Sequence, residues 1–171
     1  LEKRTGIQCC VFNPFVPILS LRLNNRDHRK ILVVDGKVAF TGGINLADEY
    51  INQKVRFGHW KDSAILVRGE AAWSMTVMFL TLWDYARDTD SGNYDAFRPV
   101  WETPVQGEGY VQPYTDSPLD GEAVGQSVYL NLINRARRYV YLTTPYLIVD
   151  DSMNTALCIA AKSGVDVRII T

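Results

Sequence analysis

The stretch R-D-H-R-K-I-L-V-V-D-G, residues 26–36, decides the fold. The apolar, β-branched run from Lys30 to Asp35 predicts a strand, and Asp35-Gly36 is typical of the turn in a β-hairpin. The returning strand is expected over residues 37–41, before Gly42 and Gly43 interrupt the pattern. His28 and Lys30 are two residues apart, so on a strand both side chains point to the same face.

Outward from this hairpin, strands and helices alternate along most of the chain, which predicts an α/β class with a layered structure. Further strands are expected over residues 7–12, 63–68, 110–112, 139–144 and 165–171. Helices are expected over residues 45–51, 70–87, 123–138 and 151–163. Residues 88–125 are rich in Asp, Gly, Pro and aromatic side chains and predict a long surface connection.

Length, composition and net charge exclude several classes of protein. The 171 residues, 47% of them hydrophobic, are enough for one compact domain or for two half-domains that share a core. A formal net charge of −1 lacks the basic excess typical of nucleic-acid binders. No apolar run approaches the roughly 20 residues that span a bilayer. The three cysteines, Cys9, Cys10 and Cys158, show no metal-ligand spacing and are expected to be buried free thiols.

The two ends of the chain resemble each other. Residues 1–13 can be laid on residues 159–171, with Gly6 on Gly164 and an offset of 164 − 6 = 158. Both segments predict the tail of a helix, a glycine and then a strand. This repeat suggests a protein made of two similar halves, although helix–glycine–strand junctions are common.

A phosphate site is expected where the hairpin pattern meets the polar residues around it. The His28 imidazole can attack phosphorus or protonate a leaving oxygen, while the Lys30 ammonium neutralises a non-bridging oxygen. Gly42 and Gly43 allow backbone N–H groups to approach an anion, and the Asn45 amide can donate to the same oxygens. This chemistry requires no metal and no cofactor.

The complete spacing, H-x-K, four residues, D, six residues, G-G-x-N, resembles the HKD motif of the phospholipase D superfamily. Three further stretches look like bacterial cardiolipin synthases: N-R-D-H-R-K at 25–30, W-K-D at 60–62 and T-P-Y at 144–146. The resemblance covers nearly the whole chain, most strongly residues 22–85 and 126–171.

The resemblance implies a phospholipase D-like fold, with a mixed β-sheet flanked by helices and two pseudo-symmetric halves. Residues 1–107 are expected to form the later part of the first half, and residues 108–171 the early part of the second. In this superfamily two HKD motifs converge, and one histidine becomes a phosphohistidine while the other protonates the departing alcohol. Cardiolipin synthases move a phosphatidyl group between phosphatidylglycerol molecules, which implies an anionic phospholipid substrate and work at the cytoplasmic face of a bacterial cell membrane.

The resemblance also assigns site residues. The predicted catalytic residues are His28, Lys30, Asp35, Asn45 and Asp62. The predicted substrate-binding residues are Arg26, Gly42, Gly43 and Tyr146. Asp62 is expected to accept a hydrogen bond from the histidine and fix its tautomer. Asp35 has either a direct role or a structural one in the turn, and His28 is either the nucleophile or the general acid.

The chain departs from the family pattern because it holds no second complete H-x-K-x4-D motif; after the other histidine, His59, come Trp60 and Lys61, but Leu66 stands where the motif has its aspartate. By the repeat offset, the partner motif is expected near position 28 + 158 = 186, beyond Thr171. Two alternatives therefore stay open beside phosphatidyl transfer: a phosphodiesterase or nuclease that uses water, and a phosphate-binding segment without turnover. Pairing of two chains as a homodimer would bring two His28 residues together.

Overall fold

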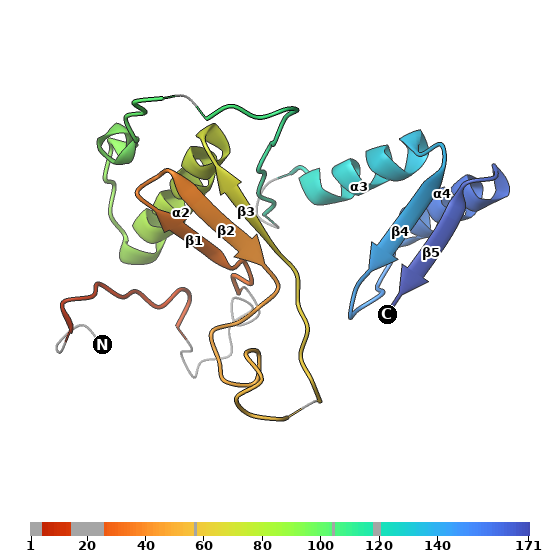
Figure 1. Cartoon of the computed structure of the whole chain (residues 1–171), viewed down its shortest axis with the longest axis horizontal. Helices are drawn as coiled ribbons and strands as arrows, with labels where there is room; N and C mark the ends of the chain where they lie inside the picture. The colour runs from red at the N-terminus through yellow and green to blue at the C-terminus, as the bar shows by residue number, and fades with distance from the viewer. Residues whose placement is uncertain (1–4, 15–25, 57, 104, 118–120) are drawn as a thin grey trace. The chain divides into compact units, whose positions relative to one another are not determined.

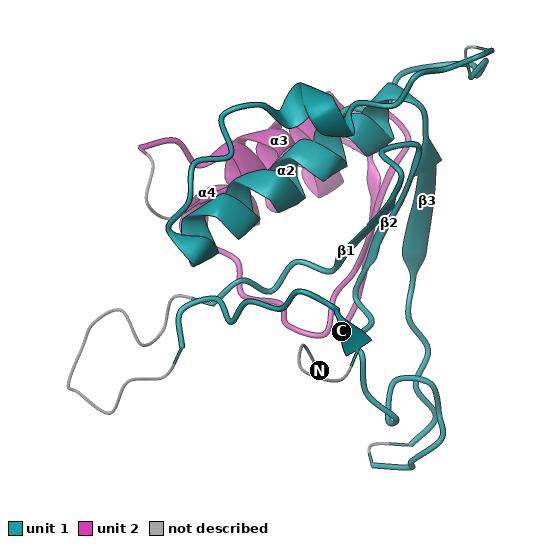
Figure 2. Ribbon diagram, turned by 90° about the vertical axis from the view of Figure 1, so that its left-hand side faces the viewer, with its two compact units in different colours: residues 1–113 teal, residues 114–171 magenta. Residues whose placement is uncertain are grey.

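The computed structural model describes residues 5–14, 26–56, 58–103, 105–117 and 121–171. The chain divides into two compact units, Leu1–Pro113 and Tyr114–Thr171, coloured separately in Figure 2. Each unit holds its own small sheet with helices packed on it (Figure 1), so the predicted α/β class is confirmed. The strands form two separate sheets, one antiparallel and one parallel. Assignment of these units to the two halves of a phospholipase D fold, with the expected boundary after residue 107, stays a prediction.

The first unit is built on an antiparallel sheet in the order β1 (Ile31–Val34), β2 (Val38–Gly42), β3 (Ala64–Arg68). The predicted hairpin turn joins β1 to β2: the Lys37 N–H donates to the Val34 carbonyl at 3.0 Å. Asp35 and Gly36 both have positive φ, 52° and 66°. Two central residues with positive φ match the twist of the flanking strands, which is why Asp-Gly suits this turn.

Helix α2 (Glu70–Arg87) packs on one face of this sheet. It begins after Gly69 and ends at Asp88, which adopts the left-handed conformation (φ 52°) and donates its N–H to carbonyls of the last turn. The core between helix and sheet consists of Ala39, Val67, Ala72 and Met75, flanked by Ile31, Val33 and Ala71. The small alanines allow close approach of the helix, so burial of this apolar face holds the unit together.

A short 3-10 helix, η2 (Tyr94–Phe97), follows α2 and was not expected from the sequence. The end of η2 lies very close to the hairpin turn: a side chain on Gly36 would be 2.9 Å from the carbonyl oxygen of Phe97. Gly36 is therefore required both by its backbone conformation and by this contact.

The second unit contains α3 (Val124–Arg135), β4 (Tyr139–Thr143), α4 (Asp151–Lys162) and β5 (Asp166–Ile170). The two strands pair in parallel, and α4 is the crossover between them. The Asp150 carboxylate caps α4 by accepting the Met153 N–H at 2.8 Å. The core beneath the sheet is formed by Ile133, Ala156, Leu157 and Ala160, with Val140, Leu142 and Val167 packed against it.

Three predicted elements are wrong. Residues 7–12, 45–51 and 110–112 adopt turns, bends or irregular backbone in place of strands and a helix. Each segment is short, and a strand this short needs a hydrogen-bonded partner that none of the described strands provides. The repeat of the chain ends is therefore not reproduced as a strand after Gly6. Cys9, Cys10 and Cys158 are free thiols as predicted, but all three are exposed and not buried. For Cys9 and Cys10 the reason is that their segment joins no sheet.

A buried carboxylate fixes the end of α2. Asp84 accepts hydrogen bonds from the Ser91 hydroxyl (2.6 Å), the Ser91 N–H (3.1 Å), the Tyr94 hydroxyl (2.9 Å) and the Thr89 hydroxyl (3.2 Å). These bonds, those from Ser91 first, outweigh burial and hold the pKa of Asp84 below its ordinary value of 3.8. The carboxylate thus ties the connection that carries η2 to the helix.

Replacement of Asp84 with Asn should lower the melting temperature by a few degrees at neutral pH, because the amide offers one acceptor oxygen where the carboxylate offers two. The folded-state pKa is depressed, so this stabilisation is present above the ordinary value of 3.8 and is lost as the pH falls through the depressed pKa. Thermal unfolding from pH 7 to pH 2 checks this. Asp90→Asn is the matched control, since the Asp90 carboxylate accepts the exposed Gly92 N–H and none of the four bonds described for Asp84. Equal melting temperatures for Asp84→Asn and wild type at pH 7 would contradict the assignment.

Candidate functional site

The antiparallel register gathers most of the predicted site residues at one end of the first sheet. Ile31 pairs with Thr41, and Gly42 pairs with Ala64. The residues just before β1, just after β2 and just before β3 therefore meet at the same end. These are the segments that contain His28 and Lys30, Gly43 and Asn45, and Asp62. Figure 1 shows the same end opposite the β1–β2 turn, where the chain continues into the long loop between β2 and β3.

His28 and Lys30 lie side by side at this end, as predicted. The Lys30 ammonium is 3.0 Å from Nδ1 of His28 and donates to the His28 carbonyl oxygen at 2.6 Å. His28 is exposed and Lys30 is half-buried, so a solvent-borne anion can reach both. The expectation that both residues stand on a strand is wrong, because β1 begins at Ile31. The contact arises from the local backbone before the strand and from the length of the lysine side chain.

Asp27 and Arg29 form a compact pair beside the histidine. Arg29 donates from Nε to one carboxylate oxygen and from its terminal nitrogen to the other, both at 2.9 Å, and its backbone N–H adds a third bond of 2.9 Å. Partial burial raises the pKa of Asp27, but the bonds from Arg29 more than offset it and leave this pKa below 3.8. Arg29 is thus bonded to Asp27, and the cation in contact with the His28 ring is the Lys30 ammonium.

The two glycines are explained by close packing as well as by the predicted anion contact. A side chain on Gly42 would lie 2.5 Å from the Ser63 carbonyl, and one on Gly43 would lie 2.5 Å from a carboxylate oxygen of Asp62. The Gly43 N–H donates to the Ser63 carbonyl at 3.3 Å, so this N–H already has a partner. Only residues without a Cβ allow β3 and Asp62 to approach this closely. Their role in substrate binding stays a prediction.

Asp62 lies at the expected end of the sheet, but its carboxylate is not bonded to His28. It accepts the Trp60 indole N–H at 3.1 Å and the Ser63 N–H at 2.7 Å. Trp60 in turn is held by Asn52, whose side chain bonds both its backbone N–H (2.6 Å) and its carbonyl (2.9 Å). The predicted His28–Asp62 hydrogen bond is therefore not formed in this structure, in which Lys30 contacts Nδ1 of the ring.

The sequence did not predict the hydrogen bonds of Trp60 to Asn52 and Asp62; it indicated core or interface packing for this tryptophan. Its ring also packs edge-to-face on Tyr50, with centroids 4.7 Å apart. The only signal in the sequence was the W-K-D stretch itself, in which an indole donor stands two residues before a carboxylate. Trp60 and Asn52 thus stabilise the loop between β2 and β3 and orient Asp62.

Asp35 lies at the opposite end of β1 from the histidine. At roughly 3.3 Å per extended residue, the chain between His28 and Asp35 spans up to about 20 Å. Of the two roles left open for Asp35, the structure accounts for the one in the turn, where the residue takes a φ of 52°. A direct role beside His28 does not fit this placement.

The remaining predicted site residues are Arg26, Asn45 and Tyr146. Arg26 is exposed, two residues before His28, and Asn45 is half-buried after the glycines. Asn45 accepts the Ala47 N–H with its carbonyl at 3.1 Å. Tyr146 belongs to the second unit, is 78% exposed and follows a local turn in which its N–H meets the Thr144 hydroxyl at 3.2 Å. The contributions of these three residues to substrate binding stay predictions.

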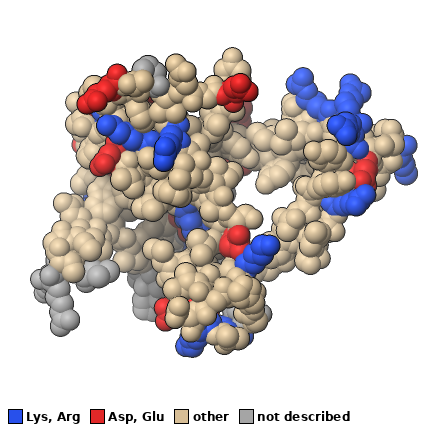
Figure 3. All heavy atoms as spheres, in the orientation of Figure 1, with Lys and Arg blue, Asp and Glu red and all other residues tan. Residues whose placement is uncertain are grey.

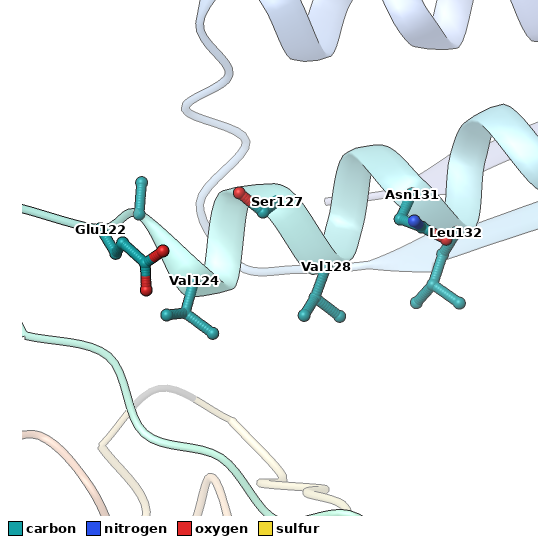
Figure 4. A pocket seen from close by; sticks show the side chains of 7 residues that line it. Glu122, Val124, Ser127, Val128, Asn131 and Leu132 are labelled. Carbon is teal, nitrogen blue, oxygen red and sulfur yellow. The ribbon is translucent and has the colours of Figure 1, made fainter.

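Other surface features bear on the kind of ligand that the described residues could hold. Among the described residues there is no cluster of His, Cys, Asp or Glu that suits a metal ion, and no helix long and apolar enough to cross a membrane. A hollow of about 460 Å³ runs along α3, where Val124, Val128 and Leu132 project in one direction (Figure 4). Its lining includes Glu122 and no cation, which does not suit a phosphate. On the face in Figure 3, several basic side chains gather over one end of the second unit, and elsewhere basic and acidic side chains are interspersed.

Similarity to known proteins supports the same reading of the motif. Residues 129–171 match the family described as "Cardiolipin synthase, PLD-like domain". Over 98% of its length the chain is 37% identical to a cardiolipin synthase of Alkalihalophilus pseudofirmus and 36% identical to one of Geobacillus kaustophilus. The chain is thus similar to these cardiolipin synthases along nearly its whole length. It is also 54% identical, over 99% of its length, to an uncharacterized protein of Streptococcus mutans.

The chain spans about a third of the length of these relatives: 33% and 34% of the two cardiolipin synthases and 36% of the streptococcal protein. The similarity to cardiolipin synthases thus covers nearly the whole chain, including the end of the first sheet with His28 and Lys30, but only part of each relative.

Replacement of Gly43 with Ala should break the Trp60–Asp62 hydrogen bond, because the new methyl group would occupy the space of the carboxylate. The indole N–H resonance of Trp60 in an NMR spectrum should move upfield, and overpacking should lower the free energy of unfolding by about 1–3 kcal/mol. Gly107→Ala is the matched control, since a side chain at Gly107 meets nothing within 4 Å. An unshifted Trp60 resonance in Gly43→Ala would show that the carboxylate does not depend on the glycine.

Proposed function

We propose that the chain supplies one half of the active site of a phospholipase D-type phosphatidyltransferase of the cardiolipin synthase kind. The proposal is carried by the contact between the His28 ring and the Lys30 ammonium, 3.0 Å apart and open to solvent at the end of the sheet. Similarity to cardiolipin synthases along the whole chain supports it. The substrate in this proposal is phosphatidylglycerol, and no metal or cofactor takes part.

The proposed reaction has two displacements at phosphorus. In the first, a ring nitrogen of His28 attacks the phosphate of one phosphatidylglycerol, the phosphorus–nitrogen bond forms, and glycerol leaves with a proton from a second acid. In the second, a hydroxyl of another phosphatidylglycerol attacks the phosphohistidine, loses its proton to the same second group and releases His28. Lys30 neutralises a non-bridging oxygen throughout, which stabilises the charge of the transition state.

A second imidazole is required by this scheme. The attacking nitrogen must carry a lone pair at the moment when the leaving oxygen needs a proton, and one ring does not serve both ends of the same displacement. The sequence holds one complete H-x-K-x4-D motif, so the proposed acid comes from a second motif in a longer protein or from a second copy of the chain. The role of His28 as nucleophile, not acid, is part of the proposal.

The proposed substrate implies a cellular location for the whole protein. Phosphatidylglycerol is a membrane lipid, so we infer that the whole protein acts at a membrane surface, on the cytoplasmic side. The balance of 18 basic and 19 acidic residues favours a lipid headgroup over DNA as the substrate, because DNA binders usually carry a basic excess.

The full-length protein is the material for the first test. Incubated with phosphatidylglycerol vesicles, it should release glycerol and form a lipid with four acyl chains in equal amounts. His28→Asn should reduce this turnover by at least about a thousandfold, and Lys30→Met by about a hundredfold or more, through loss of the nucleophile and of charge stabilisation. Mass spectrometry of the lipids and a glycerol assay measure both products.

Arg68→Met is the matched control, since Arg68 is an exposed cation at the opposite end of β3 from Asp62. Phosphatidic acid as the sole lipid product would favour a phosphodiesterase that uses water. Cleaved oligonucleotides would favour a nuclease. Full activity in His28→Asn would refute the assignment of the site.

The isolated chain should bind inorganic phosphate without turnover, since it offers one imidazole and one ammonium but no second acid. Isothermal calorimetry with phosphate and a phosphodiesterase assay, run beside a light-scattering measurement of mass, test this. Turnover by a strict monomer would contradict the two-histidine scheme. Turnover by a dimer would place the second His28 in the acid role.

A further inference from the structure

The contact between Lys30 and His28 constrains where the proton of the ring resides. An ammonium has three donors and no acceptor, so in the 3.0 Å contact Nδ1 of His28 must accept. A neutral imidazole that accepts at Nδ1 carries its proton on Nε2. The second bond, 2.6 Å from Nζ to the His28 carbonyl, holds the ammonium over this edge of the ring.

In this arrangement neither ring nitrogen offers a lone pair to phosphorus. The lone pair on Nδ1 points to the ammonium, and Nε2 bears the proton. The neighbouring cation does not relieve the contact, because Arg29 is engaged by both oxygens of Asp27. Asp62, the carboxylate expected to hold the Nδ1 proton, is bonded to Trp60 and Ser63. The histidine as folded is therefore in a resting form.

We propose that Lys30 positions His28 in the Nε2–H tautomer until an anionic phosphate oxygen takes the ammonium away. The inference rests on the proposed function of the same site and adds a regulation by substrate to it. A bond from the ammonium to an anionic phosphate oxygen joins opposite charges, whereas the bond to Nδ1 joins a charge to a neutral acceptor, so a bound phosphate competes for Nζ. The lysine side chain is long enough to rotate while its backbone stays in place.

Departure of the ammonium exchanges the tautomer without a change in the number of protons. Nε2 gives its proton to water, Nδ1 takes one from water, and the lone pair appears on Nε2, the nitrogen away from the backbone. The nucleophile is then available only when a phosphate is bound, which protects the ring from other electrophiles. The ligand class is a phosphate oxyanion, as in a lipid headgroup or in free phosphate.

Nitrogen NMR of the chain, labelled with ¹⁵N in its histidines, tests the proposal directly. The sequence has two histidines, so His59 serves as an internal reference in every spectrum. At alkaline pH, where an imidazole is neutral and an ammonium is still charged, the Nε2–H form of His28 should exceed the Nδ1–H form by at least about tenfold. Inorganic phosphate should lower this ratio for His28 by about tenfold, as loss of the ammonium does, and leave that of His59 unchanged.

Two variants separate the contact from its surroundings. Lys30→Met keeps the length of the side chain and should lower the tautomer ratio of His28 by about tenfold. Arg29→Met removes a neighbouring cation that is paired with Asp27, and it should leave the ratio unchanged. A predominant Nδ1–H form in the free wild-type chain, or equal ratios in wild type and Lys30→Met, would overturn the proposal.

A second arm distinguishes the sources of phosphate and the two hypotheses. Vesicles of phosphatidylglycerol and free phosphate are added separately. A lower ratio with vesicles alone assigns the switch to the headgroup, and a lower ratio with both assigns it to any phosphate. A tautomer switch in a protein that makes no four-chain lipid would sustain this inference and refute the proposed transfer. Synthesis of four-chain lipid with no change in the His28 tautomer would sustain the proposed transfer and refute this inference.

Discussion

Antiparallel pairing of β1 with β2 is the constraint on which the site depends. The turn at Asp35 and Gly36 sets the register, and the register sends the residues before β1 and after β2 to the same end of the sheet. A one-residue slip would exchange the buried and exposed faces of the hairpin, and Ala39 would leave the core under α2. The apolar packing that stabilises the unit thus also fixes which polar residues meet.

This geometry separates residues that the sequence motif unites. His28, Lys30 and Asp35 stand within eight positions of each other, yet the strand between them carries Asp35 to the turn. The i, i+2 spacing predicted that His28 and Lys30 meet, although the residues lie before β1 and the contact depends on the long lysine side chain. The hairpin was equally predictable from Asp-Gly between apolar runs, and with it the distance of Asp35 from the histidine. A motif records which residues occur together, and the strand length decides which of them act together.

Contacts between segments far apart in the chain were beyond sequence reasoning. The helix expected over residues 45–51 is replaced by turns, because the loop is stabilised by the Asn52 amide bound to the backbone of Trp60. The same loop directs Asp62 toward Trp60 and Gly43, which no local pattern indicates. Long elements with strong periodicity, such as α2 and α4, were predicted within a few residues, since burial of one face decides them. Short segments depend on partners that a single sequence does not reveal.

The polar end of the sheet illustrates how a fold keeps a reactive group available without leaving its charges unpaired. Asp27 is satisfied by Arg29, Asp62 by Trp60 and Ser63, and Lys30 by the two acceptors of His28. All of these bonds except the first involve one neutral group, whereas a bond between an ammonium and a phosphate joins two opposite charges. A phosphate therefore does not have to overcome an ion pair at Lys30. The site is ordered in the absence of substrate, and the bond that must break on binding is the one that costs least.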